Sequence, residues 1–209
     1  MELVDTHAHL TYEPLAGQLE QVLSRSRLVG VRRWITVGTS PEDNERAVEL
    51  ACRIEGLRAA VGYHPHYADE IGEAELQMLR RTAAHPRAAA VGETGLDYYY
   101  HHSQADNQRR IFRAQLEIAA ELQKPAVIHI REAFEEAMSI LEEYRGRLPK
   151  VVIHCYSGNL EQTAEVERRG YFVSFTGIIT FKKAEEARRA AARFPLERVM
   201  IETDCPYLS

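Results

Sequence analysis

Short apolar runs rich in Val, Ile and Ala alternate with amphipathic segments along the whole chain. Such runs are typical of buried strands, and apolar residues that recur every three to four positions predict helices. We predict eight strands, near residues 2–7, 33–38, 57–63, 87–92, 125–130, 150–155, 171–176 and 198–203. We predict seven helices between them, near residues 15–29, 41–54, 70–83, 105–123, 131–145, 159–169 and 181–194.

The alternation of strands and helices favours a parallel sheet, because parallel neighbours need a crossover that a helix usually supplies. Two α/β architectures have this order, a doubly wound open sheet and a closed (β/α)8 barrel. An open dinucleotide-binding sheet should carry a glycine-rich turn after its first strand, but the sequence there is Thr6-His7-Ala8-His9-Leu10. We therefore expect a (β/α)8 barrel with eight parallel strands and no final helix, in a single domain over residues 1–209.

Composition excludes several classes of protein. The formal net charge of -5 argues against a protein that coats nucleic acid through a broad basic face, but allows a single phosphate-binding pocket. The start of the chain has no targeting pattern, and no apolar run approaches the roughly 18 residues of a membrane span, so we expect a cytoplasmic protein. The spacing of Cys52, Cys155 and Cys205 supports neither a disulfide framework nor a CxxC zinc site.

Histidines and carboxylates stand at the ends of the predicted strands. His7 and His9 close the first strand and, being two residues apart, can share one face. His129 and His154 come at the same depth on the fifth and sixth strands. Each of these has an ordinary explanation when taken alone, as an exposed loop histidine or a core histidine that is hydrogen-bonded.

Carboxylates complete the pattern on the fourth and eighth strands. Glu93 follows an apolar strand and lies among glycines, where a buried carboxylate is costly unless it is paired or bound to metal, although a solvated loop glutamate would look the same. Asp204 ends the eighth strand, and Glu202 points to the same face one layer lower. In a closed barrel all such residues converge on one mouth.

Six residues therefore form one candidate site: His7, His9, Glu93, His129, His154 and Asp204. One cation rarely takes more than four such side chains, and a shareable carboxylate suggests two ions about 3.5 to 4 Å apart. We predict that His7 and His9 bind the first ion, that His129 and His154 bind the second, and that Glu93 bridges them. Asp204 would bind the first ion beside the attacking water and act as its general base.

The sequence resembles the TatD family of metal-dependent deoxyribonucleases. The resemblance rests on motifs spread over nearly the whole chain, namely DTHAHL at 5–10, GYHPH at 62–66, GETGLDY at 92–98, HIREA at 129–133, HCYSG at 154–158, FTG at 175–177 and ETDCPY at 202–207. It implies a TIM-like barrel of the amidohydrolase type and the same six metal ligands. It also implies Mg-dependent 3′ to 5′ exonuclease activity, preferentially on single-stranded DNA, although some relatives are linked to other targets, including removal of D-amino acids from tRNA.

Further residues near the mouth are candidates for substrate binding. The resemblance suggests that His64 touches substrate phosphate at the rim, although a solvent-facing loop histidine would look the same. Arg131 can hold a phosphate bidentately or form an ordinary salt bridge. Stacking of bases on residues 98–100, which are three tyrosines, is only weakly favoured over loop packing. Asp5 and Asp97 are candidates to orient ligand imidazoles.

Members of the family usually continue past the ETDCPY motif into a final helix, whereas this sequence stops at Ser209. We therefore expect an apolar strip between the eighth and first strands to lie uncovered, and to be available to a partner or to a second copy of the chain.

The predicted function is hydrolysis of DNA phosphodiester bonds with two divalent ions, as a 3′–5′ exonuclease on single-stranded ends. Four imidazoles favour Zn, Mn or Ni as the bound metals, with Mg or Mn supporting activity. Two alternatives remain open: an esterase or deacylase acting on D-aminoacyl-tRNA, and a catalytically impaired barrel that binds nucleic acid. A carbon–nitrogen amidohydrolase often bridges its metals with a carboxylated lysine just after the fourth strand. This class is disfavoured, because none of the lysines in the sequence, Lys124, Lys150, Lys182 and Lys183, is placed there.

Overall fold

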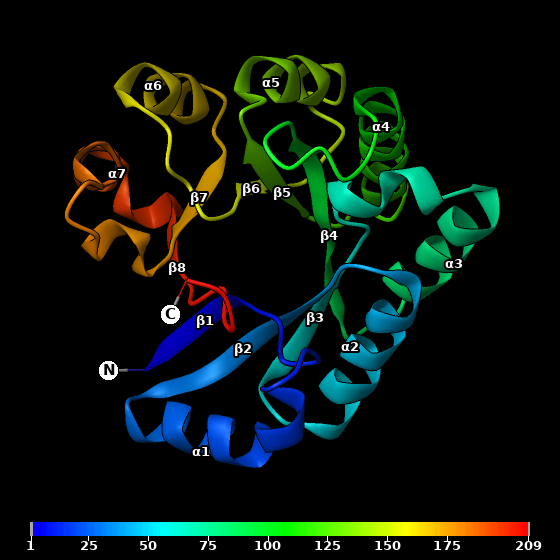
Figure 1. Ribbon diagram of the computed structural model, residues 1–209, viewed down its shortest axis with the longest axis vertical. Helices are drawn as coiled ribbons and strands as arrows, with labels where there is room; N and C mark the ends of the chain where they lie inside the picture. The colour runs from blue at the N-terminus through cyan, green and yellow to red at the C-terminus, as the bar shows by residue number, and fades with distance from the viewer. Residues whose placement is uncertain (1, 209) are drawn as a thin grey trace.

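Eight parallel strands form one sheet in the order of the sequence in the computed structural model, which describes residues 2–208. The strands are β1 (Leu3–Ala8), β2 (Val31–Gly38), β3 (Leu57–Val61), β4 (Ala88–Asp97), β5 (Ala126–Arg131), β6 (Val151–Ile153), β7 (Phe172–Phe175) and β8 (Val199–Ile201). Each strand is paired in parallel with the next one along the chain. Figure 1 shows that they curve into a barrel.

Helices alternate with the strands and lie outside them (Figure 1). They are α1 (Leu19–Leu28), α2 (Pro41–Arg53), α3 (Glu73–Ala83), α4 (Ala105–Glu121), α5 (Phe134–Glu143), α6 (Leu160–Arg168) and α7 (Glu185–Arg193). Short 3-10 helices precede four elements: η1 (Ala16–Gln18), η2 (Pro65–Glu70), η3 (Gly177–Thr180) and η4 (Leu196–Arg198). The predicted TIM-like (β/α)8 architecture is confirmed. None of the helices within residues 2–208 has the length and apolar character needed to cross a membrane.

The core has two parts, because side chains alternate between the two faces of each strand. The larger part lies between strands and helices and includes Val61, Val91 and Ile128. The smaller part lies inside the barrel and consists of Val37, Ala60, Ala90 and Val127, which come from β2 to β5. These small side chains fill the interior, so the polar residues gather at the carboxyl ends of the strands.

Strand β4 is longer than predicted. The sequence predicts a strand that ends near residue 92, just before Glu93, but β4 runs to Asp97 and contains Glu93. Gly92 and Gly95 have φ values of 144° and 145°, which residues other than glycine rarely adopt. A Cβ at Gly95 would also lie 2.0 Å from the carbonyl oxygen of His129. The glycines therefore let β4 continue against β5 and hold Glu93 inside the barrel.

Gly95→Ala is expected to destabilise the protein by about 3 kcal/mol or more, because it adds backbone strain and a clash with the β5 backbone. Gly146→Ala is the matched control, since Gly146 also has a positive φ, 76°, but nothing lies within 4 Å of an added Cβ. The control should cost only about 1 to 2 kcal/mol of backbone strain. Urea unfolding of both variants measures the difference, and equal losses would contradict the role assigned to Gly95.

The barrel closes between β8 and β1 through hydrogen bonds between the segment that follows β8 and residues in or just after β1. We call this contact the seam. The backbone N–H of Asp204 donates to the carbonyl oxygen of His7 (2.9 Å), and that of His9 donates to the carbonyl of Cys205 (2.8 Å). Asp5 accepts from the N–H and hydroxyl of Thr203, at 3.0 and 2.7 Å. Asp5 therefore fastens the seam, and the hypothesis that it orients a ligand imidazole is wrong.

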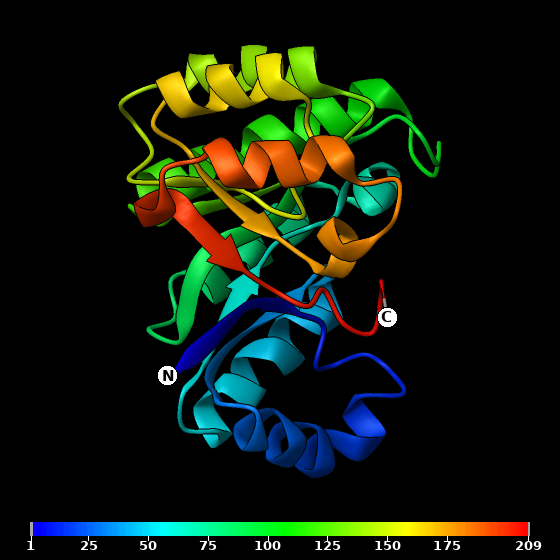
Figure 2. The ribbon, with the colours of Figure 1, turned by 90° about the vertical axis from the view of Figure 1, so that its left-hand side faces the viewer.

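The outer side of the seam is exposed. Figures 1 and 2 show α1 and α7 on either side of β8 and β1, and within residues 2–208 no helix lies over these two strands. Val4 is 39% exposed and Ile201 is 51% exposed. The described residues thus leave an apolar strip uncovered where the sequence predicts one, and its occupant stays a prediction.

Candidate metal centre

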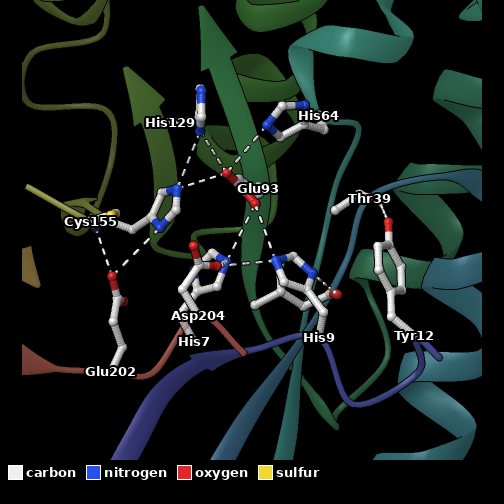
Figure 3. Close-up of polar contacts among 12 residues, drawn as sticks. His7, His9, Tyr12, Thr39, His64, Glu93, His129, Cys155, Glu202 and Asp204 are labelled. Atoms are coloured by element: carbon white, nitrogen blue, oxygen red, sulfur yellow. Dashed lines mark hydrogen bonds and ion pairs between the residues drawn. The ribbon is translucent and has the colours of Figure 1, made fainter. Parts of the chain in front are cut away.

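Glu93 lies at the centre of the candidate site, where β4 passes through the barrel (Figure 3). It is buried, and its two carboxylate oxygens face different histidines. Oε1 lies 2.8 Å from Nδ1 of His129 and 2.7 Å from Nε2 of His154. Oε2 lies 3.3 Å from Nε2 of His7 and 3.9 Å from Nε2 of His9. One carboxylate therefore stands between two pairs of imidazoles.

Asp204 reaches the same place from the segment after β8. Its backbone has a φ of 56°, a left-handed value that aspartate tolerates better than most residues. Oδ1 lies 3.3 Å from Nε2 of His9 and 3.7 Å from Nε2 of His7. The carboxylate thus joins the pair of histidines that faces Oε2 of Glu93.

The orientation of His9 leaves an acceptor facing carboxylates. Its Nδ1 donates to the carbonyl oxygen of Val37 (3.2 Å), so in the neutral ring Nε2 carries a lone pair directed at Asp204. Two acceptors at this distance need a cation or a proton between them. Burial opposes protonation, but the hydrogen bond to Asp204 and the charge of Glu93 raise the pKa of His9 above its usual value.

His7 gives an independent indication that the residues fit a cation. Its side chain is completely buried, and neither ring nitrogen forms a hydrogen bond among the described residues. Buried polar atoms without a hydrogen-bond partner are rare and call for an explanation such as a bound ion. Because Nε2 of His7 faces Glu93 and Asp204, a divalent cation among these groups would satisfy the ring and both carboxylates.

Three groups within residues 2–208 have ligand atoms close enough to hold one ion, each within 4.8 Å of the others. They are His7, His9 and Asp204; His64, Glu93 and His129; and His7, His154 and Glu202. The first contains the ligands predicted for the first ion. The second contains two of the ligands predicted for the second ion and adds His64. The structure therefore brings all six predicted ligands into one connected cluster.

Charge within the cluster is balanced between its carboxylates and imidazoles. Burial opposes ionisation of Glu93, but the positive charge of His154 holds its pKa well below the usual value. Burial likewise opposes protonation of His154, whereas the charge of Glu93 and the hydrogen bond to Glu202 raise its pKa well above the usual value. The carboxylates thus favour positive charge among the histidines, the condition that also favours metal ions.

Asp97, at the end of β4, fixes the ring of His129. Nε2 of His129 donates to Oδ2 of Asp97 (3.0 Å), which leaves the lone pair of Nδ1 directed at Glu93. Burial opposes ionisation of Asp97, but hydrogen bonds from His129 and His66 hold its pKa below the usual value. The geometry agrees with the expectation that Asp97 orients a ligand imidazole.

Two residues of this network carry no role in the sequence prediction. His66 lies 3.0 Å from Oδ2 of Asp97 through its Nε2, so it shares the carboxylate with His129. Glu202 accepts from the backbone N–H of Cys155 (2.7 Å) and lies 3.6 Å from Nδ1 of His154. The sequence does contain a pattern that points to both residues. His66 is two residues from His64 and Glu202 is two residues from Asp204, and residues two apart can share a face.

The two residues predicted to bind substrate differ in how deeply they lie: His64 is largely buried, whereas Arg131 is exposed. Nε2 of His64 is 3.5 Å from Oε1 of Glu93, so His64 lies inside the cluster rather than at its rim. Nδ1 of His64 accepts from the backbone N–H of His66 (3.2 Å), which places the ring proton on Nε2. Burial lowers the pKa of His64 well below its usual value, so the ring is neutral. Arg131 is exposed beside the mouth.

Cys155 adjoins the cluster but does not offer a nucleophile. Its side chain contacts the hydroxyl of Thr176 at 3.6 Å. Burial raises the pKa of its thiol to about 11, so the sulfur is protonated at neutral pH. The candidate chemistry therefore rests on metal ions and carboxylates, as the sequence predicts.

Comparison with known proteins gives one consistent result. Residues 4–209 match the model of a family described as TatD-related DNases. An uncharacterised metal-dependent hydrolase of Bacillus subtilis, YabD, is 36% identical over 99% of this chain and 81% of its own length. The 3′-5′ ssDNA/RNA exonuclease TatD of Shigella flexneri is 33% identical over 99% of this chain and 80% of its own length. The crystal structure of YjjV, a TatD homologue from Escherichia coli, superposes with a TM-score of 0.92 at 30% identity, covering 98% of this chain and 80% of that one.

Proposed function

Because this chain belongs to the TatD-related DNase family and is a metal-dependent hydrolase, we propose that it removes nucleotides from the 3′ end of single-stranded DNA with two divalent ions. The observation that carries the proposal is the position of Glu93, whose two carboxylate oxygens face separate pairs of histidines. A bridging carboxylate between two ions has this arrangement. The exonuclease name of the relative from Shigella flexneri supports the choice of substrate.

In this proposal each residue has a defined task. When bound, the two ions supply positive charge for the phosphate and lower the pKa of the attacking water. His7 and His9 would hold one ion and His129 and His154 the other, and Glu93, which faces both pairs, would contribute to both. Asp97 keeps His129 in the tautomer whose Nδ1 lone pair points inward.

Asp204 accepts the proton of the attacking water. Its carboxylate is only partly exposed and lies beside His9, on one side of Glu93. His64 contributes a donor on the other side, because its neutral ring carries the proton on Nε2. That proton favours a hydrogen bond to a phosphate oxygen over direct ligation of a metal. Arg131 adds a positive charge at the mouth, where the rest of the strand must lie.

The metals follow from the ligands. Four imidazoles favour Zn, Mn or Ni, whereas Mg prefers oxygen ligands and supports activity when abundant. A cytoplasmic location belongs to the same proposal.

Digestion of end-labelled single-stranded DNA with a panel of Mg, Mn, Zn and Ni tests the proposal. A 3′ label should be released first, and a 5′ label should yield progressively shorter strands. D-aminoacyl-tRNA is assayed beside the DNA with the same ions. Deacylation of the tRNA without digestion of DNA would show that aminoacyl-tRNA, and not DNA, is the substrate. Metal-independent binding of DNA without cleavage would instead support an inactive barrel that binds nucleic acid.

A further inference from the structure

Two exposed tyrosines follow β4 at the mouth of the barrel. Tyr99 is 49% exposed and Tyr100 is 48% exposed, and their rings pack edge to face with centroids 4.8 Å apart. The guanidinium of Arg131 lies 4.1 Å from the ring centroid of Tyr99 and 4.7 Å from that of Tyr100. We call Tyr99, Tyr100 and Arg131 the aromatic rim.

The aromatic rim is held in place by the residue that orients His129. The backbone N–H groups of Tyr99 and Tyr100 both donate to Oδ1 of Asp97, at 3.0 Å each. The other oxygen of this carboxylate accepts from His129 and His66. The two tyrosines are therefore anchored to the same group as a predicted metal ligand, so their position relative to the centre is fixed.

Aromatic contacts also connect the rim with the centre. The ring of Tyr100 lies 5.5 Å from that of His66, and the ring of His66 lies 4.2 Å from that of His64. His102 stacks on Tyr100, with centroids 5.7 Å apart and an interplanar angle of 17°. A continuous series of rings thus runs from the exposed tyrosines to the side chain that faces Glu93.

The charge of Arg131 is not neutralised by a carboxylate. Within residues 2–208 its guanidinium forms no ion pair and lies over the two tyrosine rings, which leaves its N–H groups available. A cation stacked on aromatic rings keeps its charge and loses conformational freedom. This combination of a fixed positive group and exposed rings matches a nucleotide, which carries a phosphate and a flat base.

We propose that the aromatic rim is a nucleobase-stacking subsite for the strand next to the phosphate that is cleaved. The inference rests on the proposed function and deepens it, because it says how the enzyme recognises a polynucleotide. Stacking on aromatic rings is available to every base, so the subsite tolerates any sequence. Bases paired within a duplex do not present their faces, so the subsite selects unpaired ends.

The first experiment measures steady-state kinetics on a single-stranded oligonucleotide. The double variant Tyr99→Ala, Tyr100→Ala should raise KM by about 10- to 100-fold, the range expected for the loss of base stacking. The double variant Tyr99→Phe, Tyr100→Phe keeps both rings and should retain the wild-type KM within about threefold. Leu196→Ala, at an apolar position that is 84% exposed at the opposite end of the barrel, controls for nonspecific surface effects.

A second substrate isolates the base. An oligonucleotide of the same length, with abasic sites near its 3′ end, keeps the phosphates and loses the rings. The wild-type protein should bind it about as weakly as the alanine double variant binds normal DNA, and the two alanine substitutions should add no further loss. A KM for normal DNA that changes less than twofold in the alanine variant would overturn the inference.

Binding without turnover separates this inference from the proposed function. A strand with 2-aminopurine near its 3′ end is titrated into Glu93→Gln protein, and stacking should quench the fluorescence of the base. Quenching that depends on the tyrosine rings supports the subsite even if wild-type protein releases no nucleotide, an outcome that would refute only the proposed reaction. Binding with no quenching, or quenching that persists in the alanine variant, refutes the subsite.

Discussion

Glu93→Gln is expected to lower turnover of single-stranded DNA by about 10³-fold or more, because a neutral amide cannot bridge two cations and offers only one acceptor oxygen. The carboxylate oxygens of Glu93 lie within 3.3 Å of three imidazoles, those of His7, His129 and His154. The amide has nearly the same size, so the packing of β4 should remain. Turnover is measured with the end-labelled strand under saturating Mn or Mg.

The control for this substitution is Glu135→Gln, which removes the same charge from an exposed position in the first turn of α5. Circular dichroism and thermal unfolding establish that both variants are folded. Activity of the Glu93 variant within tenfold of wild type would contradict a bridging role. If Glu93→Gln does not fold, the same assay is carried out with Glu93→Asp, which keeps the carboxylate but shortens the side chain.

Removal of divalent ions should lower the midpoint of thermal unfolding by about 5 to 10 °C. An ion present at 100 times its Kd stabilises the native state by about 2.7 kcal/mol, and in a chain of this length each kcal/mol shifts the midpoint by about 2 to 4 °C. The physical reason lies in the buried cluster, where His7 has no hydrogen-bond partner and Asp204 faces a lone pair of His9.

Calorimetry in chelator, and then with added Zn, Mn or Mg, tests this expectation. Zn and Mn should restore the midpoint at lower concentrations than Mg, since the cluster contains four imidazoles. In the Glu93→Gln variant the recovery should be much smaller. Equal midpoints for wild-type protein in chelator and in saturating Zn or Mn would show that these residues do not bind metal in the native state.

Most of the fold could be predicted because each strand and helix has a clear local pattern. The exception is the second half of β4, where Gly92 and Gly95 indicate a loop when the sequence is considered alone. Glycine is disfavoured within strands, but here the absence of a Cβ is what allows β4 to approach β5. The deciding contact, with the carbonyl oxygen of His129, joins residues far apart in the sequence.

The central residues could also be predicted, because a parallel barrel brings every strand end to one mouth. His7, His9 and Glu93 needed only that rule to be placed together. Residues that act through another side chain were harder to predict, since their role depends on which partner they meet. Asp5 and Asp97 look alike in the sequence, since both are aspartates near predicted metal ligands. Asp97 contacts the ring of His66, whereas Asp5 contacts Thr203 and fastens the seam.

The seam has a mechanical consequence for the centre. Two of the hydrogen bonds across the seam use the backbone of His7, His9 and Asp204. The side chains of the same three residues form one of the candidate ion groups. A fluctuation that separates β8 from β1 must therefore also pull Asp204 away from the two histidines. An ion bound by all three side chains would connect the two sides of the seam. Metal binding and closure of the barrel would then be thermodynamically coupled.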